Sequence, residues 1–424
     1  MNFILKGDIC YSINPQTLNS VLNGYLVCEN GKSKGTFVKV PEKFKDFPII
    51  DYSDHMIIPG LCDLHTHAPQ YSFRGLGMDM ELLDWLDNYT FPEESKYSDP
   101  EYADKAYTFF VDDLRRSATT RASIFATLHV DATIKLMEKL DSTGLCTFVG
   151  KVNMDANCPD YLIEESAESA TQNTREWIEN TKGRFKNTAP IISPRFIPTC
   201  SEELLNKLKK LQVEFNLPVQ SHLSENKAEI AWVKKLFKGA ESYGDVYNSF
   251  GLFGNVDTPT IMAHCVWSAG PEEDLIKHNG VYVAHCPQSN TNLASGIAPI
   301  RRFLNHGIRV GLGSDVAGGS SISIFRTMCD AIQASKLHWR LINQDEKPLT
   351  VNEAFYLGTI GSGSFFGKVG SFESGYEFDA LVIDDKNLSS IIDLTPEKRL
   401  TRIMYLSEDK NIHAKYVKGE EIKL

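Results

Sequence analysis

The sequence predicts an α/β fold in which a TIM (β/α)8 barrel is joined to a small β-sandwich formed by the N- and C-terminal segments. Two observations lead to this prediction. Short apolar runs alternate with helical stretches through the middle of the chain, and turn-punctuated β segments lie at both ends. We therefore expect a β-sandwich domain from residues 1–56 and 376–424, and a barrel domain from residues 57–375.

Eight apolar runs in the middle of the chain each end in polar residues. They cover residues 57–65, 123–129, 146–152, 190–196, 218–222, 261–264, 281–285 and 310–315. Strands buried on both faces read as such continuous runs, although a short run alone does not separate a strand from a buried helix. Residues 98–101, Ser-Asp-Pro-Glu, supply a capping residue and an N-terminal proline for a helix over 102–116. Eight strand-and-helix units are the number that a TIM barrel needs.

Both ends of the chain show β patterns. Residues 3–11, 24–31 and 35–40 are strand-like, and Asn30-Gly31 is a strong hairpin signal. Matching strand patterns occur near the C-terminus. Two terminal β segments around a long middle predict one unit built from both ends.

The composition excludes several classes of function. The 424 residues are 42% hydrophobic and 23% charged, which is typical of a globular protein, and the net charge of −11 argues against binding to nucleic acid or to an anionic membrane. We find no signal peptide and no run of about 18 apolar residues. Nine cysteines without a C-x-x-C pair fit reduced thiols. We therefore expect a cytoplasmic protein.

The most informative stretch is residues 59–70, Pro-Gly-Leu-Cys-Asp-Leu-His-Thr-His-Ala-Pro-Gln. It places His65 and His67 two residues apart at the end of a predicted strand. That spacing points both imidazoles to one side, which suits a divalent ion such as zinc or iron. A chance His-x-His is the alternative, so the prediction depends on whether later strands supply further ligands.

Other predicted strands also end in candidate ligands, namely His129, His222, His264, His285 and Asp315. The carboxyl ends of barrel strands meet at one mouth, so these side chains should come together. We predict that His65, His67, His222 and Asp315 hold a metal ion. Three histidines and one carboxylate leave a position for water, as a catalytic rather than a structural site requires.

The remaining polar residues near these strand ends lie around the predicted ligands. Glu225 lies three residues after His222, where a carboxylate could face the water, although a loop glutamate can also be a solvated charge. We expect His264 to bind the water or the transition state. His129 and His285 should support the ligands or pack around them.

Several longer segments support a closer comparison. They are residues 65–73 (His-Thr-His-Ala-Pro-Gln-Tyr-Ser-Phe), 83–92 (Leu-Asp-Trp-Leu-Asp-Asn-Tyr-Thr-Phe-Pro), 193–196 (Ser-Pro-Arg-Phe), 221–226 (Ser-His-Leu-Ser-Glu-Asn), 284–290 and 313–319. The chain resembles the amidohydrolase superfamily and, within it, the guanine deaminases, from about Ile57 to Asp384. His-x-His marks only the superfamily, whereas His-Ala-Pro-Gln together with Pro-Arg-Phe is specific to the guanine deaminases.

The resemblance implies roles for individual residues. The family's metal ligands fall on His65, His67, His222 and Asp315, its catalytic residues on Glu225, His264 and Asp315, and its purine-binding residues on Gln70, Arg195 and Phe196. It also implies one zinc ion per chain, with iron possible, and a homodimer. Gln288 replaces the family's asparagine, which affects only the loop after the seventh strand.

The chemistry of guanine agrees with these assignments. A planar, neutral base calls for an amide (Gln70), a guanidinium that donates to the carbonyl oxygen (Arg195) and apolar walls such as Phe73, Trp85 and Phe196. Arg195 could instead form a salt bridge at the barrel mouth. The expected reaction is attack of hydroxide on purine carbon 2, with protons taken up by Glu225 and Asp315, giving xanthine and ammonia.

Three alternatives remain open. One is a related aminohydrolase that acts on cytosine, an adenosine-type nucleoside or a triazine. Another is a hydantoinase-like enzyme with two metals, but its bridging lysine at the end of strand four has no counterpart, because no lysine lies within 190–200. The third is a non-enzymatic scaffold, which would not need four ligands and Glu225.

Overall fold

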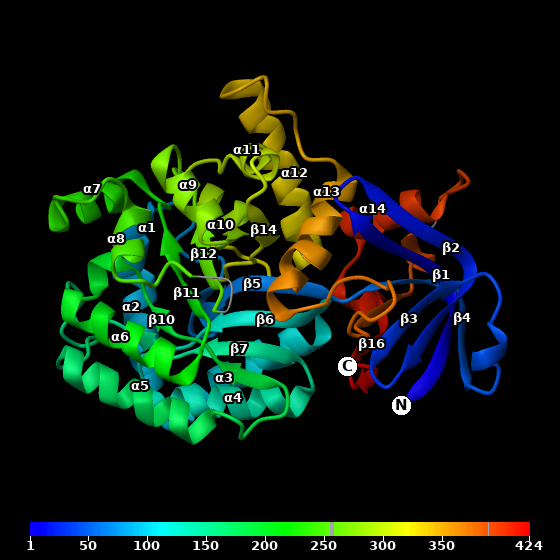
Figure 1. The fold of residues 1–424 in the computed structure, drawn as a ribbon, viewed down its shortest axis with the longest axis horizontal. Helices are drawn as coiled ribbons and strands as arrows, with labels where there is room; N and C mark the ends of the chain where they lie inside the picture. Colours follow the sequence, from blue (N-terminus) through cyan, green and yellow to red (C-terminus); the bar gives the residue numbers. More distant parts are fainter. Residues whose placement is uncertain (255–257, 389) are drawn as a thin grey trace.

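The computed structural model describes residues 1–254, 258–388 and 390–424, and its central part is the predicted barrel (Figure 1). Its strands are β5 (Leu61–His67), β6 (Thr119–Phe125), β7 (Cys146–Gly150), β8 (Val152–Asn153), β9 (Thr188–Pro190), β10 (Ser193–Pro194), β11 (Val219–Leu223), β12 (Thr260–His264), β13 (Tyr282–His285) and β14 (Arg309–Leu312). Two parallel sheets, β5-β6-β7-β9 and β11-β12-β13-β14, form its two halves.

Backbone hydrogen bonds connect these halves at both sides. The Ile192 amide donates to the Pro218 carbonyl (3.0 Å), and the Gln220 amide donates to the Ile192 carbonyl (2.9 Å), which joins β11 to the β9–β10 segment. On the other side, the Asp315 amide donates to the His65 carbonyl at 2.8 Å. The first and last barrel strands are therefore neighbours, and the predicted TIM barrel is confirmed.

An aspartate reinforces the junction between β5 and β14. The buried carboxylate of Asp63 accepts from the Ser314 amide (3.0 Å) and the Ser314 hydroxyl (2.5 Å), and also from the His65 amide (3.1 Å). Burial raises the pKa of Asp63 to about 6, even though these hydrogen bonds favour its ionised form. Asp63 thereby fixes the strand that carries His65 relative to the loop that carries Asp315.

Several strands differ from their predicted ranges. The first predicted run, residues 57–65, is divided between β4 (Ile49–Pro59) and β5, and the fourth, residues 190–196, is divided between β9 and β10. The second barrel strand is Thr119–Phe125, whereas the sequence led us to expect residues 123–129. Its first residues are polar, but Arg121 is buried because its guanidinium pairs with Asp379, with Nε and Nη2 at 2.6 and 3.1 Å from the two carboxylate oxygens. His129 consequently does not end a strand; it precedes helix α4 (Val130–Thr143).

Helices follow the strands and cover the outside of the barrel (Figure 1). The larger ones are α3 (Pro100–Arg116), α4, α5 (Ala167–Thr181), α6 (Glu202–Phe215), α7 (Lys227–Leu236), α8 (Tyr243–Ser249), α9 (Pro271–His278), α10 (Pro287–Asn292), α11 (Ile300–Asn305), α12 (Ile324–Leu341) and α13 (Val351–Tyr356). Helix α3 begins as predicted, because Asp99 accepts the Glu101 amide at 2.9 Å and Pro100 occupies the first turn. None of the helices within the described ranges is long and apolar enough to cross a membrane.

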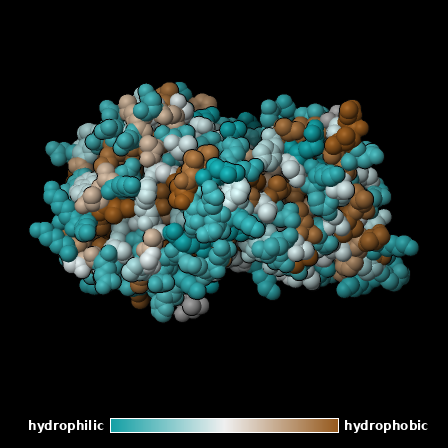
Figure 2. All heavy atoms as spheres, turned by 90° about the horizontal axis from the view of Figure 1, so that it is seen from above, coloured by the Kyte–Doolittle hydropathy of each residue, from teal (hydrophilic) through white to brown (hydrophobic). Residues whose placement is uncertain are grey.

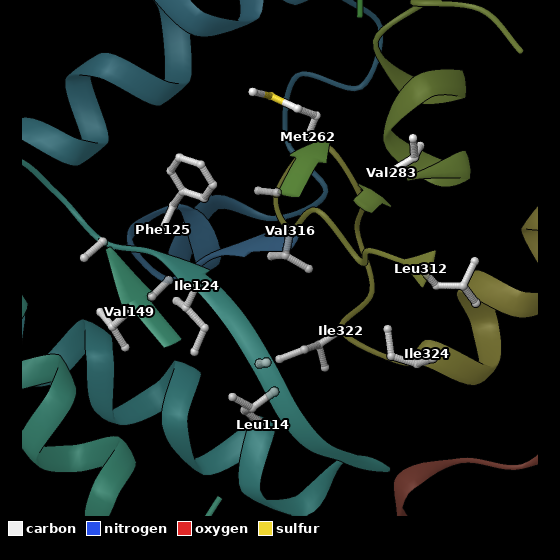
Figure 3. Close-up of a cluster of buried hydrophobic side chains, with 14 of the residues drawn as sticks. Leu114, Ile124, Phe125, Val149, Met262, Val283, Leu312, Val316, Ile322 and Ile324 are labelled. Atoms are coloured by element: carbon white, nitrogen blue, oxygen red, sulfur yellow. The ribbon is translucent and has the colours of Figure 1, made fainter. Parts of the chain in front are cut away.

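Alternation along the strands separates two layers of the core. Ile261, Ala263 and Ala284 belong to a cluster inside the barrel, whereas Met262 and Val283 belong to the large cluster between strands and helices. Figure 3 shows part of this large cluster, in which Met262 and Val283 are drawn together with Phe125, Leu312 and Ile324. Because side chains alternate along each strand, apolar side chains fill the barrel below its mouth. The strand ends remain available for polar residues.

The terminal segments share one seven-stranded sheet in the order β17-β16-β15-β4-β1-β2-β3. Its strands are β1 (Asn2–Asn14), β2 (Thr17–Glu29), β3 (Lys32–Phe37), β4 (Ile49–Pro59), β15 (Ala380–Ile383), β16 (Ile412–Val417) and β17 (Glu420–Ile422). The predicted union of both chain ends is therefore present, and it forms the smaller of two lobes in Figure 2. Helix α14 (Pro396–Leu406), which we did not predict, packs on β1 and β2. Strand β4 runs past residue 56, and the domain limits stay a prediction.

Candidate functional site

Three histidine side chains meet at the mouth of the barrel. His65 and His67 come from β5 and His222 from β11, and Nε2 of His67 lies 3.2 Å from Nε2 of each of the other two. Asp315, just after β14, completes the group, with Oδ1 at 3.1 Å from His65 Nε2 and 3.4 Å from His67 Nε2. The structure thus brings together all four predicted ligands.

The protonation of these groups suits a cation. Nδ1 of His222 lies 2.6 Å from the Arg195 carbonyl, so Nδ1 carries the proton and Nε2 presents a lone pair. Burial and the neighbouring histidines hold the pKa of His67 and His222 well below the usual range. Burial alone would raise the pKa of Asp315, but the histidines hold it well below its usual range. Converging neutral imidazoles and a buried carboxylate are the donors that zinc or iron requires.

A second possible donor group contains a residue that the sequence did not suggest. Potential ligand atoms of His65, His264, Cys286 and Asp315 also lie within 4.8 Å of one another. Burial raises the pKa of the Cys286 thiol well above its usual value, and the thiol donates to the Ala284 carbonyl at 3.4 Å. Because three imidazoles and one carboxylate form a typical catalytic metal site with a position left for water, the three-histidine, one-aspartate group is the better candidate.

Glu225 faces this group from the loop after β11. Its Oε2 lies 3.3 Å from Nε2 of His264, and Oε1 accepts a hydrogen bond from the Ser295 hydroxyl at 3.2 Å. Burial, followed by the charge of Asp315, raises the pKa of Glu225 well above its usual value. Oδ1 of Asn290 lies 2.9 Å from Nδ1 of His264, the ring nitrogen that does not face Glu225. Glu225 is therefore buried in the site, and the solvated-charge alternative is excluded.

A second glutamate, which sequence reasoning missed, holds the Glu225 loop. Glu229 accepts the backbone amides of Glu225 and Asn226 at 3.1 and 3.3 Å, and the Tyr243 hydroxyl at 2.8 Å. Glu229 also lines the pocket, and burial together with the Glu225 charge raises its pKa to about 7. The Asn226 capping box at the start of α7 is the sequence signal that could have identified it.

On another wall, a third glutamate, which the sequence analysis also missed, joins two predicted residues. Arg195 donates from Nη1 and Nη2 to the two carboxylate oxygens of Glu94, at 2.6 and 3.1 Å, and Gln70 Nε2 donates to the same carboxylate at 3.0 Å. Arg195 therefore does form a salt bridge, with Glu94, as the alternative interpretation of its sequence position proposed. Arg195 and Gln70 nevertheless also line the pocket.

The residues of both walls line one pocket, which holds about 420 Å³ of space when its opening to solvent is included. It is lined by His67, Gln70, Leu82, Trp85, Leu86, Arg195, Phe196, His222, Glu225, Glu229, His264, Leu293 and Asp315. Trp85 and Phe196 contribute walls as expected. The expectation for Phe73 was wrong, because Phe73 packs behind Trp85, with their ring centroids 5.5 Å apart.

The other residues considered from the sequence lie outside this pocket lining. His285 is buried, and burial lowers its pKa to about 3. His129 lines a separate surface pocket beside α4. The side chain of Gln288 donates to Asp330 at 3.1 Å and accepts from the Ser320 amide at 2.7 Å, so the departure at this position affects a loop contact.

Comparisons with known proteins agree with this geometry. Residues 56–422 match the model of the amidohydrolase family. The guanine deaminase of Dictyostelium discoideum is 40% identical over 383 residues, covering 88% of this chain and 84% of the relative. The guanine deaminase of Escherichia coli K12 is 33% identical, covering 96% and 93%.

A solved structure extends the similarity to three dimensions. The guanine deaminase of C. acetobutylicum, crystallised with guanine in its active site, has a TM-score of 0.97 and 49% identity, and the match covers 100% of both chains. An adenosine deaminase from Xanthomonas campestris with bound zinc has a TM-score of 0.82 at 19% identity, which is a similarity of fold.

Proposed function

Because this chain belongs to the amidohydrolase family, and within it to the guanine deaminases, we propose that it hydrolyses guanine to xanthine and ammonia. The observation that supports this most strongly is the arrangement of one pocket. Its inner end has the three-histidine, one-aspartate group beside Glu225, and another wall has Gln70, Arg195 and Phe196. A planar base between these walls would place its exocyclic amine near the metal ligands.

We assign one metal ion per chain to His65, His67, His222 and Asp315, with zinc as the first candidate and iron as the second. When bound there, such an ion would act as a Lewis acid and lower the pKa of a coordinated water toward about 7. The residues around it perform the remaining tasks. Asp63 accepts the His65 amide and so fixes the strand that carries His65. The Arg195 carbonyl binds Nδ1 of His222 and so fixes that imidazole.

Glu225 moves the protons. Because burial raises its pKa, its carboxyl group can both accept and return a proton. It accepts a proton from the attacking water, with Asp315 as the second acceptor, and passes a proton to the ring nitrogen next to carbon 2. A second transfer, to the exocyclic amine, lets ammonia leave. His264, 3.3 Å from Glu225, orients the oxygen that adds to carbon 2.

Recognition of the base falls to the opposite wall. Arg195 has N–H donors for the purine carbonyl oxygen, Gln70 offers a donor and an acceptor, and Phe196 and Trp85 contact the ring faces. Adenine lacks the carbonyl oxygen and would leave the Arg195 N–H groups that do not bind Glu94 without an acceptor. The site therefore favours guanine over adenine.

The direct test is ammonia release from guanine, adenine, cytosine and their nucleosides by the purified protein. We expect guanine to be the preferred substrate. Preference for another base would assign the chain to a related aminohydrolase reaction, and two metals per chain would favour the hydantoinase-like alternative. A metal-free, inactive protein would indicate a scaffold.

We also propose that the protein is a cytoplasmic homodimer. The supporting arguments are the resemblance to the guanine deaminases and nine free cysteines within the chain. Light scattering coupled to size-exclusion chromatography would give twice the chain mass of 47.5 kDa. A monomer would contradict the dimer.

A further inference from the structure

The base-binding wall contains a charge that the proposed reaction does not use. Glu94, on helix α2 (Phe91–Ser95), is 2% exposed, and its carboxylate accepts three hydrogen bonds, two from Arg195 and one from Gln70. Glu94 is not among the residues that line the pocket. It acts on a ligand through its two partners.

The first effect of Glu94 is on orientation. A carboxylate only accepts hydrogen bonds, so the nitrogen of the Gln70 amide must face Glu94, and the oxygen then accepts from the Ala317 amide at 3.2 Å. The fork to Arg195 fixes the plane of the guanidinium, which lies over the Phe91 ring at 5.2 Å. Both recognition groups are held before a base enters.

The second effect is on charge. Three ionisable groups outside the metal group interact electrostatically with this pair, namely Tyr107, His129 and Cys158. Burial lowers the pKa of His129 and raises the pKa of Tyr107 and Cys158, so these three groups are uncharged at neutral pH. Glu225, Glu229 and Asp315 line the pocket nearer to the metal ligands. At the base-binding wall, the charges of Arg195 and Glu94 therefore balance each other.

We propose that Glu94 is a specificity-determining residue that keeps this wall electrically neutral, so that the pocket accepts neutral guanine and does not retain anionic xanthine. This inference rests on the proposed function, because it concerns its substrate and product. Guanine is neutral at physiological pH, whereas xanthine loses a ring proton near neutrality. A guanidinium without its counter-charge would attract that anion.

The test compares inhibition by xanthine in the unmodified protein and in Glu94→Gln. We expect the variant to bind xanthine roughly tenfold more tightly relative to guanine, above the pH at which xanthine ionises and not below it. Glu94→Asp keeps the charge and should restore the parent ratio. An unchanged ratio in Glu94→Gln at both pH values would overturn the proposal.

A matched control separates charge from general loss of structure. Arg121 and Asp379 form an equally buried pair, with side chains 4% and 0% exposed against 4% and 2% for Arg195 and Glu94, but they lie outside the pocket lining. Asp379→Asn should destabilise the protein and leave the xanthine-to-guanine ratio unchanged. A rise in the ratio in this control would also contradict the proposal.

Two further measurements keep the result interpretable. If Glu94→Gln does not fold, the double variant Glu94→Gln with Arg195→Met removes both charges. It should bind both bases more weakly at the parent ratio, and xanthine tightening in it would refute the charge argument. If the protein releases no ammonia from guanine, the proposed function is refuted. Calorimetric binding of guanine and xanthine then still tests this inference, because binding needs no turnover.

Discussion

The Glu225 carboxylate lies 3.3 Å from Nε2 of His264, and both side chains are at least 95% buried. This contact connects the proposed proton carrier to the histidine that we propose orients the water. Glu225→Gln preserves size and hydrogen bonding but cannot carry a proton. Turnover should fall by about 10² to 10⁴ while metal content stays at the parent level. Steady-state rates with elemental analysis check this, and loss of metal would place Glu225 among the ligands.

The metal group predicts a stoichiometry. Purified protein prepared without chelators should contain about one zinc or iron per chain. His65→Ala combined with His67→Ala removes two of four ligands, so metal and activity should both disappear. His285→Ala is the matched control, because His285 is buried nearby without belonging to the ligand group, and it should retain the ion. Two ions per chain, or none, would contradict this assignment.

The base-binding wall predicts discrimination between purines. In the unmodified protein guanine should exceed adenine by roughly 10³ in kcat/KM, because adenine leaves a buried donor unpaired. The double variant Arg195→Met with Glu94→Gln avoids a stranded buried carboxylate and should lose activity on guanine, keep its metal and narrow this gap. Equal turnover of both bases by the parent would refute the guanine assignment.

Glu229 predicts a pH dependence of stability. Its pKa is about 7 in the folded protein against about 4.5 when unfolded, so the folded state holds more protons between these values. Its contribution to stability is complete below about pH 4.5 and falls as pH rises to 7, by about 3 kcal/mol at most. Glu229→Gln should lose less stability than the parent between about pH 5 and pH 8 in urea unfolding. Parallel losses in the two proteins would contradict the assignment.

The parts of the molecule that follow local rules could be predicted from sequence. The i, i+2 spacing of His65 and His67 on a strand determines that their imidazoles meet, and strand-end position brings His222 and Asp315 to the same mouth. The capping residue Asp99 likewise places the start of α3. These features depend on neighbours in the chain or on the general geometry of a barrel.

Features that depend on distant partners could not be predicted. Thr119 and Arg121 look too polar for a buried strand until Asp379, 258 residues away from Arg121, neutralises the guanidinium. Glu94 follows Glu93 in the sequence, and nothing local distinguishes the glutamate that holds Arg195 from its neighbour, which pairs with Lys96 at 2.7 Å. Such pairings are set by the tertiary fold.

The bond between Asp63 and Ser314 spans 251 residues, and it has a consequence for synthesis on the ribosome. His65 and His67 emerge early, but the aspartate that completes their group comes after Ser314, about three quarters of the way along the chain. An incomplete nascent chain carries these histidines without Asp315. The four proposed ligands can therefore come together only after the final barrel strand has been translated.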